Sequence, residues 1–214
     1  QVRFTKNGGD ATEAAVRLAR KVTDKCFILT VRDAYHGPHS DLVGNAGSRD
    51  GGVLEEITRH IMRCPSPEAM IHFLKEDNPG IACVIAEPIQ VDGTIWPWAE
   101  IKDACHKAGA LLIFDEVITG FRYGPGSAVN GLVRYPSRDE GFDFSKYTLI
   151  PDLYCFGKAI ANGMPLACVS GPRNLMKEYE HEVFFSSTAA AECLSLAACK
   201  TTLEVMQREP VHEH

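Results

Sequence analysis

The stretch ALLIFDEVITGFR, residues 110–122, decides the fold that the sequence predicts. Its apolar run predicts a buried strand over 110–114, and Asp115 stands directly after that strand. The stretch PDLYCFGKAIANGMP, residues 151–165, has the same layout, with an apolar run that ends just before Lys158. An acid and an amine are therefore each expected where a buried strand ends.

Strand and helix patterns alternate along the chain. The predicted strands are 26–31, 81–86, 110–114, 152–156 and 166–170, and the predicted helices are 10–22, 53–62, 66–77, 98–108, 172–181 and 190–207. Such alternation predicts an α/β fold, a three-layer α/β/α arrangement around a mostly parallel central sheet. In that architecture, active residues gather at the carboxyl ends of the strands.

One segment departs from this alternation. Residues 122–150 are rich in glycine, proline, serine and charged residues, and they are too many for a tight connection between two elements. We therefore expect this segment to form a loop or lid inserted near the active site.

The combination of Asp115 and Lys158 suits one cofactor, pyridoxal phosphate. A carboxylate opposite the nitrogen of its pyridine ring keeps that nitrogen protonated, and a lysine amine forms a Schiff base with its aldehyde carbon. Taken alone, a lysine after a strand is more often a solvated surface residue, because lysine is mostly exposed. The prediction therefore depends on the segments that accompany these two residues.

Two segments offer donors for the phosphate of such a cofactor. Gly8 and Gly9 form a turn that leads into a helix with an apolar stripe, so unpaired backbone N–H groups at its start would point at an anion. Thr188 stands just ahead of a long helix rich in alanine and leucine, and it offers a hydroxyl and a further N–H group. Both segments favour phosphate binding.

Two further segments place aromatic and polar side chains after predicted strands. DAYHGPHS puts Tyr35 and His36 directly after the apolar run CFILTV, where an aromatic ring could stack on the face of the cofactor. IACVIAEPIQVDG ends a strand at Glu87, and Gln90 follows three residues later. All four are candidate cofactor-binding residues.

With these motifs in this order, the chain resembles the class III, fold-type I aminotransferases that depend on pyridoxal phosphate. The resemblance covers essentially the whole chain and rests on Gly8-Gly9, Tyr35-His36-Gly37, Glu87-Pro88, Asp115-Glu116-Val117, Lys158 and Thr188. It implies that residues 1–214 form the cofactor-binding large domain and that the small C-terminal domain of the family is absent.

The resemblance implies a role for each motif. Lys158 would be the Schiff-base lysine, and Asp115 would be the partner of the pyridine nitrogen. Tyr35 would stack on one face of the ring, and Val117 would pack on the other. The remaining implied contacts are the amides of Gly8 and Gly9 on the phosphate, Gln90 beside the phenolic oxygen, and Thr188 on the phosphate of the neighbouring subunit in a homodimer.

The chain departs from the family pattern at three places. Asn7-Gly8-Gly9 stands where Ser-Gly-Thr is usual, which keeps the turn but loses a hydroxyl. Asp92 stands where many members have a glutamate that gates the active site. After Thr188, the residues Ala189 to Cys193 replace an aromatic residue and two glycines. The LSLAA that follows, together with Glu192, indicates the branch that resembles glutamate-semialdehyde aminomutase.

Composition agrees with a soluble domain. With 214 residues, 45% of them hydrophobic and 23% charged, the chain can bury one good core. The net charge of −6 argues against nucleic acid as a partner, and no apolar run approaches the ~20 residues of a membrane span. The eight cysteines follow no zinc spacing and lie mostly in apolar stretches, so we expect reduced core residues in a cytoplasmic protein.

Other interpretations of some residues stay open. His36 and His39 could bind a metal, but no third ligand stands nearby, so we favour loop histidines and predict no metal. Glu87 and Asp92 could be a paired acid and base, or structural carboxylates. Trp96-Pro97-Trp98 could bind a ligand, although packing at the start of a helix is favoured.

Three functions are consistent with these residues. The favoured one is transamination, in which Lys158 serves as general acid and base while an amino group moves from an amino donor to an oxo acceptor. The same site could catalyse an aminomutase reaction of the glutamate-semialdehyde type. The third possibility is a truncated, non-catalytic domain that keeps the fold as a partner of another protein.

Overall fold

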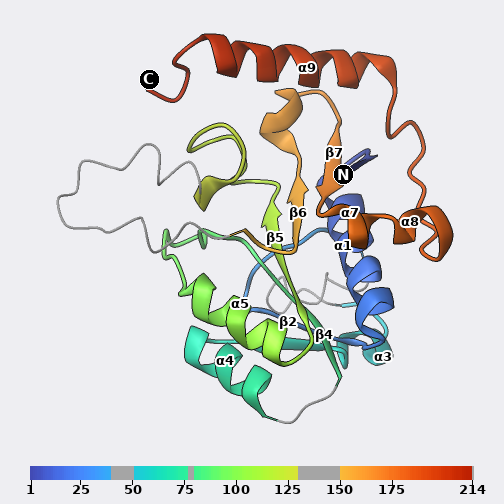
Figure 1. Ribbon diagram of the computed structural model, residues 1–214, viewed down its shortest axis with the longest axis vertical. Helices are drawn as coiled ribbons and strands as arrows, with labels where there is room; N and C mark the ends of the chain where they lie inside the picture. Colours follow the sequence, from blue (N-terminus) through green and yellow to red (C-terminus); the bar gives the residue numbers. More distant parts are fainter. Residues whose placement is uncertain (40–50, 77–79, 130–149, 214) are drawn as a thin grey trace.

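The computed structural model describes residues 1–39, 51–76, 80–129 and 150–213 of the protein (Figure 1). In these residues, seven strands form one sheet in the order β1-β7-β6-β5-β4-β2-β3. Their bounds are Val2–Thr5 for β1, Phe27–Val31 for β2, Ile61–Cys64 for β3, Ile81–Ala86 for β4, Leu111–Glu116 for β5, Leu153–Phe156 for β6 and Ala167–Ser170 for β7.

The sheet is mostly parallel, as the alternation of strands and helices predicted. Strands β2, β3, β4, β5 and β6 run parallel to one another, whereas β7 pairs antiparallel with both β6 and β1. In the centre, Asp115 of β5 lies in register with Cys155 of β6. The carboxyl ends of β4, β5 and β6 therefore meet at one edge of the sheet.

Helices cover both faces of the sheet and make three layers (Figure 1). On one face lie α1 (Gly8–Thr23), α7 (Arg173–Met176) and α8 (Glu178–His181). On the other face lie α4 (Pro67–Lys75) and α5 (Trp98–Lys107). The three-layer α/β/α fold predicted from the sequence is confirmed.

The remaining helices stand at the ends of the sheet. A short α3 (Glu55–Thr58) precedes β3, and a 3₁₀ helix, η2 (Lys158–Ala161), follows β6 directly. The long α9 (Cys193–Arg208) packs chiefly on η2 through a small apolar cluster that includes Cys199 and Leu166.

Burial on both faces explains why the central strands are continuous apolar runs. In β5, Ile113 packs toward α1, whereas Leu112 and Phe114 pack toward α4 and α5. In β4, Ile85 and Val84 divide between the two faces in the same way. A parallel strand covered by helices on both sides needs apolar side chains at every position.

The sequence prediction was wrong at the edges of the sheet. Residues 53–62, predicted as a helix, contain only the four helical residues of α3, and β3 begins at Ile61. The prediction also missed β1, and the helix predicted at 172–181 is divided into α7 and α8. Four-residue strands at sheet edges carry too few positions to show a period of two.

Two other expectations concern the whole chain. All eight cysteines are free, and six of them are buried. No helix in the described ranges is long and apolar enough to cross a membrane.

Most of the loop or lid predicted at 122–150 falls on residues 130–149, which lie outside the described part of the chain.

Candidate active site

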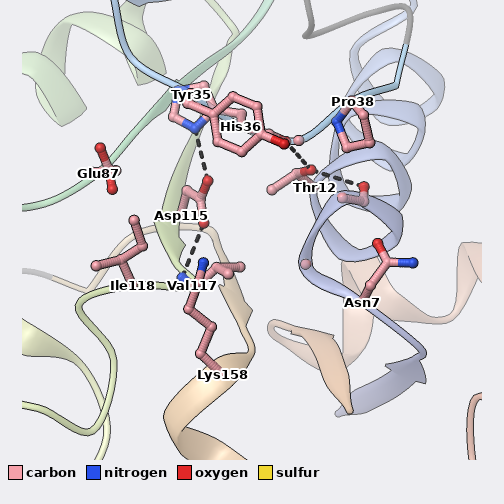
Figure 2. A pocket seen from close by; sticks show the side chains of 13 residues that line it. Asn7, Thr12, Tyr35, His36, Pro38, Glu87, Asp115, Val117, Ile118 and Lys158 are labelled. Atoms are coloured by element: carbon pink, nitrogen blue, oxygen red, sulfur yellow. Dashed lines mark hydrogen bonds and ion pairs between the residues drawn. The ribbon is translucent and has the colours of Figure 1, made fainter. Parts of the chain in front are cut away.

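The strand ends and the start of α1 surround a cavity of about 340 Å³ (Figure 2). Its lining residues are Asn7, Gly8, Gly9, Thr12, Tyr35, His36, Gly37, Pro38, Glu87, Asp115, Val117, Ile118 and Lys158. Eight of the ten candidate residues named from the sequence therefore line one cavity, and Gln90 and Thr188 do not.

The glycine turn brings the start of α1 against the other walls of the cavity. A Cβ atom on Gly8 would lie 2.6 Å from Val117 Cγ1, and one on Gly9 would lie 2.9 Å from Pro38 Cδ. Asn7 caps the helix by accepting a hydrogen bond from the Asp10 amide. The amides of Gly8 and Gly9 open the helix, so they have no carbonyl partner within it and remain able to bind an anion.

Asp115, the penultimate residue of β5, is a buried carboxyl group that contacts His36 and the Val117 amide. Its Oδ2 atom lies 2.8 Å from His36 Nδ1, and its Oδ1 atom accepts a hydrogen bond of 3.0 Å from the Val117 amide. The other ring nitrogen of His36 lies 3.0 Å from Thr30 Oγ1. When His36 donates from Nδ1, its Nε2 accepts from the Thr30 hydroxyl, so the imidazole holds Asp115 in one orientation.

Lys158 is the first residue of η2 and extends into the cavity toward Asp115 (Figure 2). Its backbone has φ 42°, the left-handed region that residues other than glycine seldom adopt. Residues with such a backbone conformation are common at functional sites, where the surrounding structure imposes the conformation. The conformation follows from an immediate change of direction between β6 and η2.

An aromatic and a branched side chain form opposite walls of the cavity. Tyr35 is 53% exposed, with its ring lying in front of His36 (Figure 2), and Val117 packs against the glycine turn. A flat ring between them would contact an aromatic face on one side and methyl groups on the other.

Glu87 contributes a second carboxyl group to the cavity. It follows β4 and is 4% exposed. Burial raises the pKa of Glu87, and the neighbouring carboxylate of Asp115 raises it further, while His36 and Lys158 lower it. A like charge at close range inside a protein opposes ionisation of the Glu87 carboxyl group.

Two of the candidate residues lie elsewhere in the single chain. Gln90 lines a neighbouring cavity, and its side-chain amide donates a hydrogen bond of 2.6 Å to the Glu87 carbonyl. This hydrogen bond occupies the Gln90 side-chain amide, which the family resemblance placed beside the phenolic oxygen of the cofactor. Thr188 is exposed in a turn ahead of α9, away from the cavity of its own chain.

Sequence reasoning missed Thr12, which shapes the cavity, and it assigned Gly37 no role of its own. The Thr12 hydroxyl donates a hydrogen bond of 2.6 Å to the His36 carbonyl and is buried in α1. Gly37, with φ 107°, approaches so closely that a Cβ atom there would lie 2.6 Å from Gly9 Cα. A hydroxyl on the otherwise apolar stripe of the first helix was the available signal for Thr12.

The geometry also bears on the alternative interpretations. His39 contacts Asp10 and Glu13 on α1, and within the described ranges no three His, Cys, Asp or Glu side chains are grouped so as to hold a metal. Asp92 is exposed and accepts hydrogen bonds from Thr94. The side chain of Trp98 is buried and stacks on Trp96, as expected for packing.

The turn that carries Thr188 is attached to the glycine turn at both of its ends. Ser187 Oγ donates to Asp10 Oδ2 at 2.6 Å and accepts from the Lys6 amide at 3.2 Å. Glu192 forms an ion pair of 3.0 Å with Lys6 and caps α9 by accepting from its first amides. The position of Thr188 is thereby coupled to the start of α1.

Comparisons with known proteins give a consistent result. A family model described as "Aminotransferase class-III" matches residues 1–214. Glutamate-1-semialdehyde 2,1-aminomutase of Ignicoccus hospitalis is 33% identical over 230 residues, which cover 99% of this chain and 51% of that protein. The protein of the same name from Thermomicrobium roseum is 35% identical over 226 residues, covering 98% and 49%.

A solved structure agrees with these sequence matches. The FumI protein of Sphingopyxis sp. MTA144, described in its pyridoxal-phosphate internal aldimine form, superposes with a TM-score of 0.84 at 25% identity, covering 99% of this chain and 49% of that one. The chain spans about half the length of the curated relatives it matches. The family resemblance inferred from the motifs is confirmed.

The attachment of the Thr188 turn predicts an acid-sensitive element. The contacts with Ser195 and then with Lys6 lower the pKa of Glu192 from 4.5 to about 2. The stabilisation from this carboxylate is present above the unfolded pKa and is lost as pH falls toward the folded one. Between about pH 6 and pH 3, the midpoint temperature of thermal unfolding should therefore fall less in Glu192→Gln than in the wild type. Circular dichroism measures this midpoint.

Glu204→Gln, an exposed substitution on the same helix, is the matched control and should follow the wild-type profile. Identical pH profiles for the two variants would show that the Glu192 contacts do not stabilise the folded protein.

Proposed function

Because this chain is a member of the class III aminotransferases, we propose that its cavity binds pyridoxal phosphate and that the protein transfers an amino group from an amino donor to an oxo acceptor. One observation supports this most directly. Asp115 and Lys158, from the ends of neighbouring strands β5 and β6, face the same cavity, and the glycine turn of α1 closes another side of it (Figure 2).

The residues present fit this cofactor by size and by chemistry. Positions 8 and 9 require glycine, because a Cβ atom at either would clash with Val117 or Pro38. The backbone amides of these two glycines are free where a phosphate is expected. Asp115 provides a buried carboxyl group for the ring nitrogen. Tyr35 and Val117 provide the two faces.

Each of these residues has a defined task in the proposed reaction. When bound, the cofactor supplies a protonated ring that withdraws electrons from the substrate carbon. His36 keeps Asp115 aimed at the ring nitrogen through the contact at 2.8 Å, and we assign it this orienting role in place of direct contact with the ring. The Lys158 amine holds the cofactor, and once released it can remove and return a proton on the substrate.

A specific observation favours a second reaction on the same residues. Both relatives described above are named glutamate-1-semialdehyde 2,1-aminomutase. An aminomutase differs from a transaminase in keeping the intermediate bound between the two half-reactions, so that the amino group returns to the same molecule at another carbon. Release of an oxo product into solution after a single turnover with an amino donor distinguishes transamination.

The surroundings of Thr188 support a homodimer. Thr188 is exposed and outside the cavity of its own chain, and two apolar side chains near it are open to solvent, Phe184 at 86% and Leu194 at 66% exposure. A contact surface formed with a second copy of the chain would cover these two exposed apolar side chains. We propose a cytoplasmic homodimer in which Thr188 reaches the phosphate of the neighbouring subunit.

Lys158 should be the only lysine that carries the cofactor. Borohydride reduction of the cofactor-saturated protein, followed by peptide mapping, should label Lys158, because among the described residues it is the lysine that lines the cavity and extends toward Asp115. The variant Lys158→Ala should take up no label. A label on another lysine, or none in the saturated wild type, would disprove the assignment.

Asp115→Asn should leave the fold and the labelling of Lys158 intact but slow the half-reaction with an amino donor by roughly a hundredfold or more. A neutral amide cannot hold the ring nitrogen protonated. Rapid-mixing absorbance measures this rate, and Asp103→Asn, an exposed substitution on α5, is the control. A near-normal rate in Asp115→Asn would remove Asp115 from the mechanism.

Thr188→Ala should weaken cofactor retention by about tenfold, since a hydroxyl bound to a phosphate contributes on the order of 1.5 kcal/mol. Sedimentation should show a dimer for both proteins, and dialysis followed by absorbance should measure retention. Thr201→Ala, exposed on α9, should behave as wild type. A monomer that still binds the cofactor tightly would contradict both the dimer and the role of Thr188.

A further inference from the structure

A second cavity adjoins the one that Asp115 and the glycine turn line. It has a volume of about 490 Å³, and it shares Val117 and Lys158 with the first cavity. Its other walls include the loop after β5 and the turn after η2. Because Lys158 lines both cavities, a substrate that reacts beside this lysine can extend from the first cavity into the second.

The charged side chains that line the second cavity are all positive. They are Lys6, Arg122 and Lys158, and none of the described lining residues is an aspartate or a glutamate. Lys6 forms an ion pair of 3.0 Å with Glu192, and the proposed function uses the amine of Lys158 to hold the cofactor. Of the described lining residues, Arg122 therefore carries the charge that remains to be balanced. A ligand group with a single negative charge would balance it.

The backbone fixes one side of the Arg122 guanidinium. Its Nε atom donates a hydrogen bond of 2.6 Å to the Ile118 carbonyl, four residues earlier in the chain. Its two Nη atoms make no hydrogen bond or ion pair with any described residue. A planar guanidinium with free terminal N–H groups offers two parallel donors, which is the arrangement that a carboxylate accepts in a bidentate pair.

The loop that carries this arginine is held at both ends by one buried carboxyl group. Glu116, at the end of β5, accepts hydrogen bonds of 2.6 Å from the Thr119 hydroxyl and 3.1 Å from the Ala128 amide. Phe121 has φ 62°, a left-handed backbone that the surrounding structure imposes, and its ring centre lies 5.3 Å from that of Phe156 in β6. The position of the next residue is therefore set before a ligand binds.

An exposed arginine is most often a hydrated surface residue. Arg122 differs because its Nε is fixed, its loop is held in place, and it lines a cavity that reaches Lys158. We propose that the second cavity receives a carboxylate group of the substrate and that Arg122 binds this carboxylate. This assignment rests on the proposed function, and it narrows the substrates to amino acids and oxo acids, as opposed to amines and aldehydes without an acidic group.

The first test compares acids with their uncharged amides. The pairs are L-alanine with L-alaninamide and 4-aminobutanoate with 4-aminobutanamide, so the carboxylate lies either next to the carbon that bears the amine or farther along the chain. In the cofactor-saturated wild type, the acid of at least one pair should react about tenfold or more faster than its amide, because the amide cannot form the charged pair. In Arg122→Gln, this ratio should fall below about threefold. Rapid-mixing absorbance at subsaturating substrate measures both rates.

The second test uses neither the cofactor nor a reaction. Glutarate has two carboxylates and no amine, and isothermal titration calorimetry should show that it binds the cofactor-free wild type. Arg122→Gln should weaken this binding about tenfold, and Arg122→Lys should recover only part of it, because a lysine amine lacks the two parallel donors. Arg173→Gln, at an exposed arginine of α7 outside both cavities, is the control and should bind glutarate as the wild type does.

The two tests separate the carboxylate site from the proposed function. If glutarate binding depends on Arg122 but none of the four amines reacts with the cofactor-saturated protein, the proposed function is wrong and the carboxylate site is supported. Equal rates for acid and amide in both pairs of the wild type would overturn the carboxylate site. A wild-type ratio in Arg122→Gln, or glutarate binding as tight in Arg122→Gln as in the wild type, would overturn the role of Arg122.

Discussion

The contact of 2.8 Å between Asp115 and His36 determines the shape of the cavity. It joins the end of β5 to the loop after β2 across the intervening strand β4. With the imidazole fixed, the His36 carbonyl accepts from Thr12, and Gly37 lies against Gly9. The loop that carries Tyr35 is thereby placed beside the start of α1, so the aromatic wall and the glycine turn of the cavity depend on one buried pair.

The sequence was sufficient to predict the centre of this arrangement. Strands buried on both faces must be apolar throughout, so the first polar residue after each run marks a strand end. Asp115 and Lys158 were found in this way, and parallel strand ends share one edge of the sheet. Gly8 and Gly9 could be predicted as candidate site residues, because two glycines directly before a helix with an apolar stripe have few purely structural explanations.

Other parts of the structure depend on contacts that a sequence pattern does not show. The edge strands β1 and β3 have four residues each, too few for a periodic signal. Gln90 has the chemistry for a ring contact, but its amide is used by the Glu87 carbonyl. Thr188 and Ser187 are neighbours in sequence, yet only the fold shows that Ser187 binds Asp10, 177 positions away.

The left-handed backbone of Lys158 links its amine to helix α9. A residue with a side chain at φ 42° stores on the order of 1 kcal/mol of strain, which the packing of η2 must offset. Ile160 and Ala161 of η2 are buried in the cluster that α9 covers. Helix α9 therefore holds η2 in place. A looser contact between them would let the Lys158 backbone relax and turn its amine away from the strand ends.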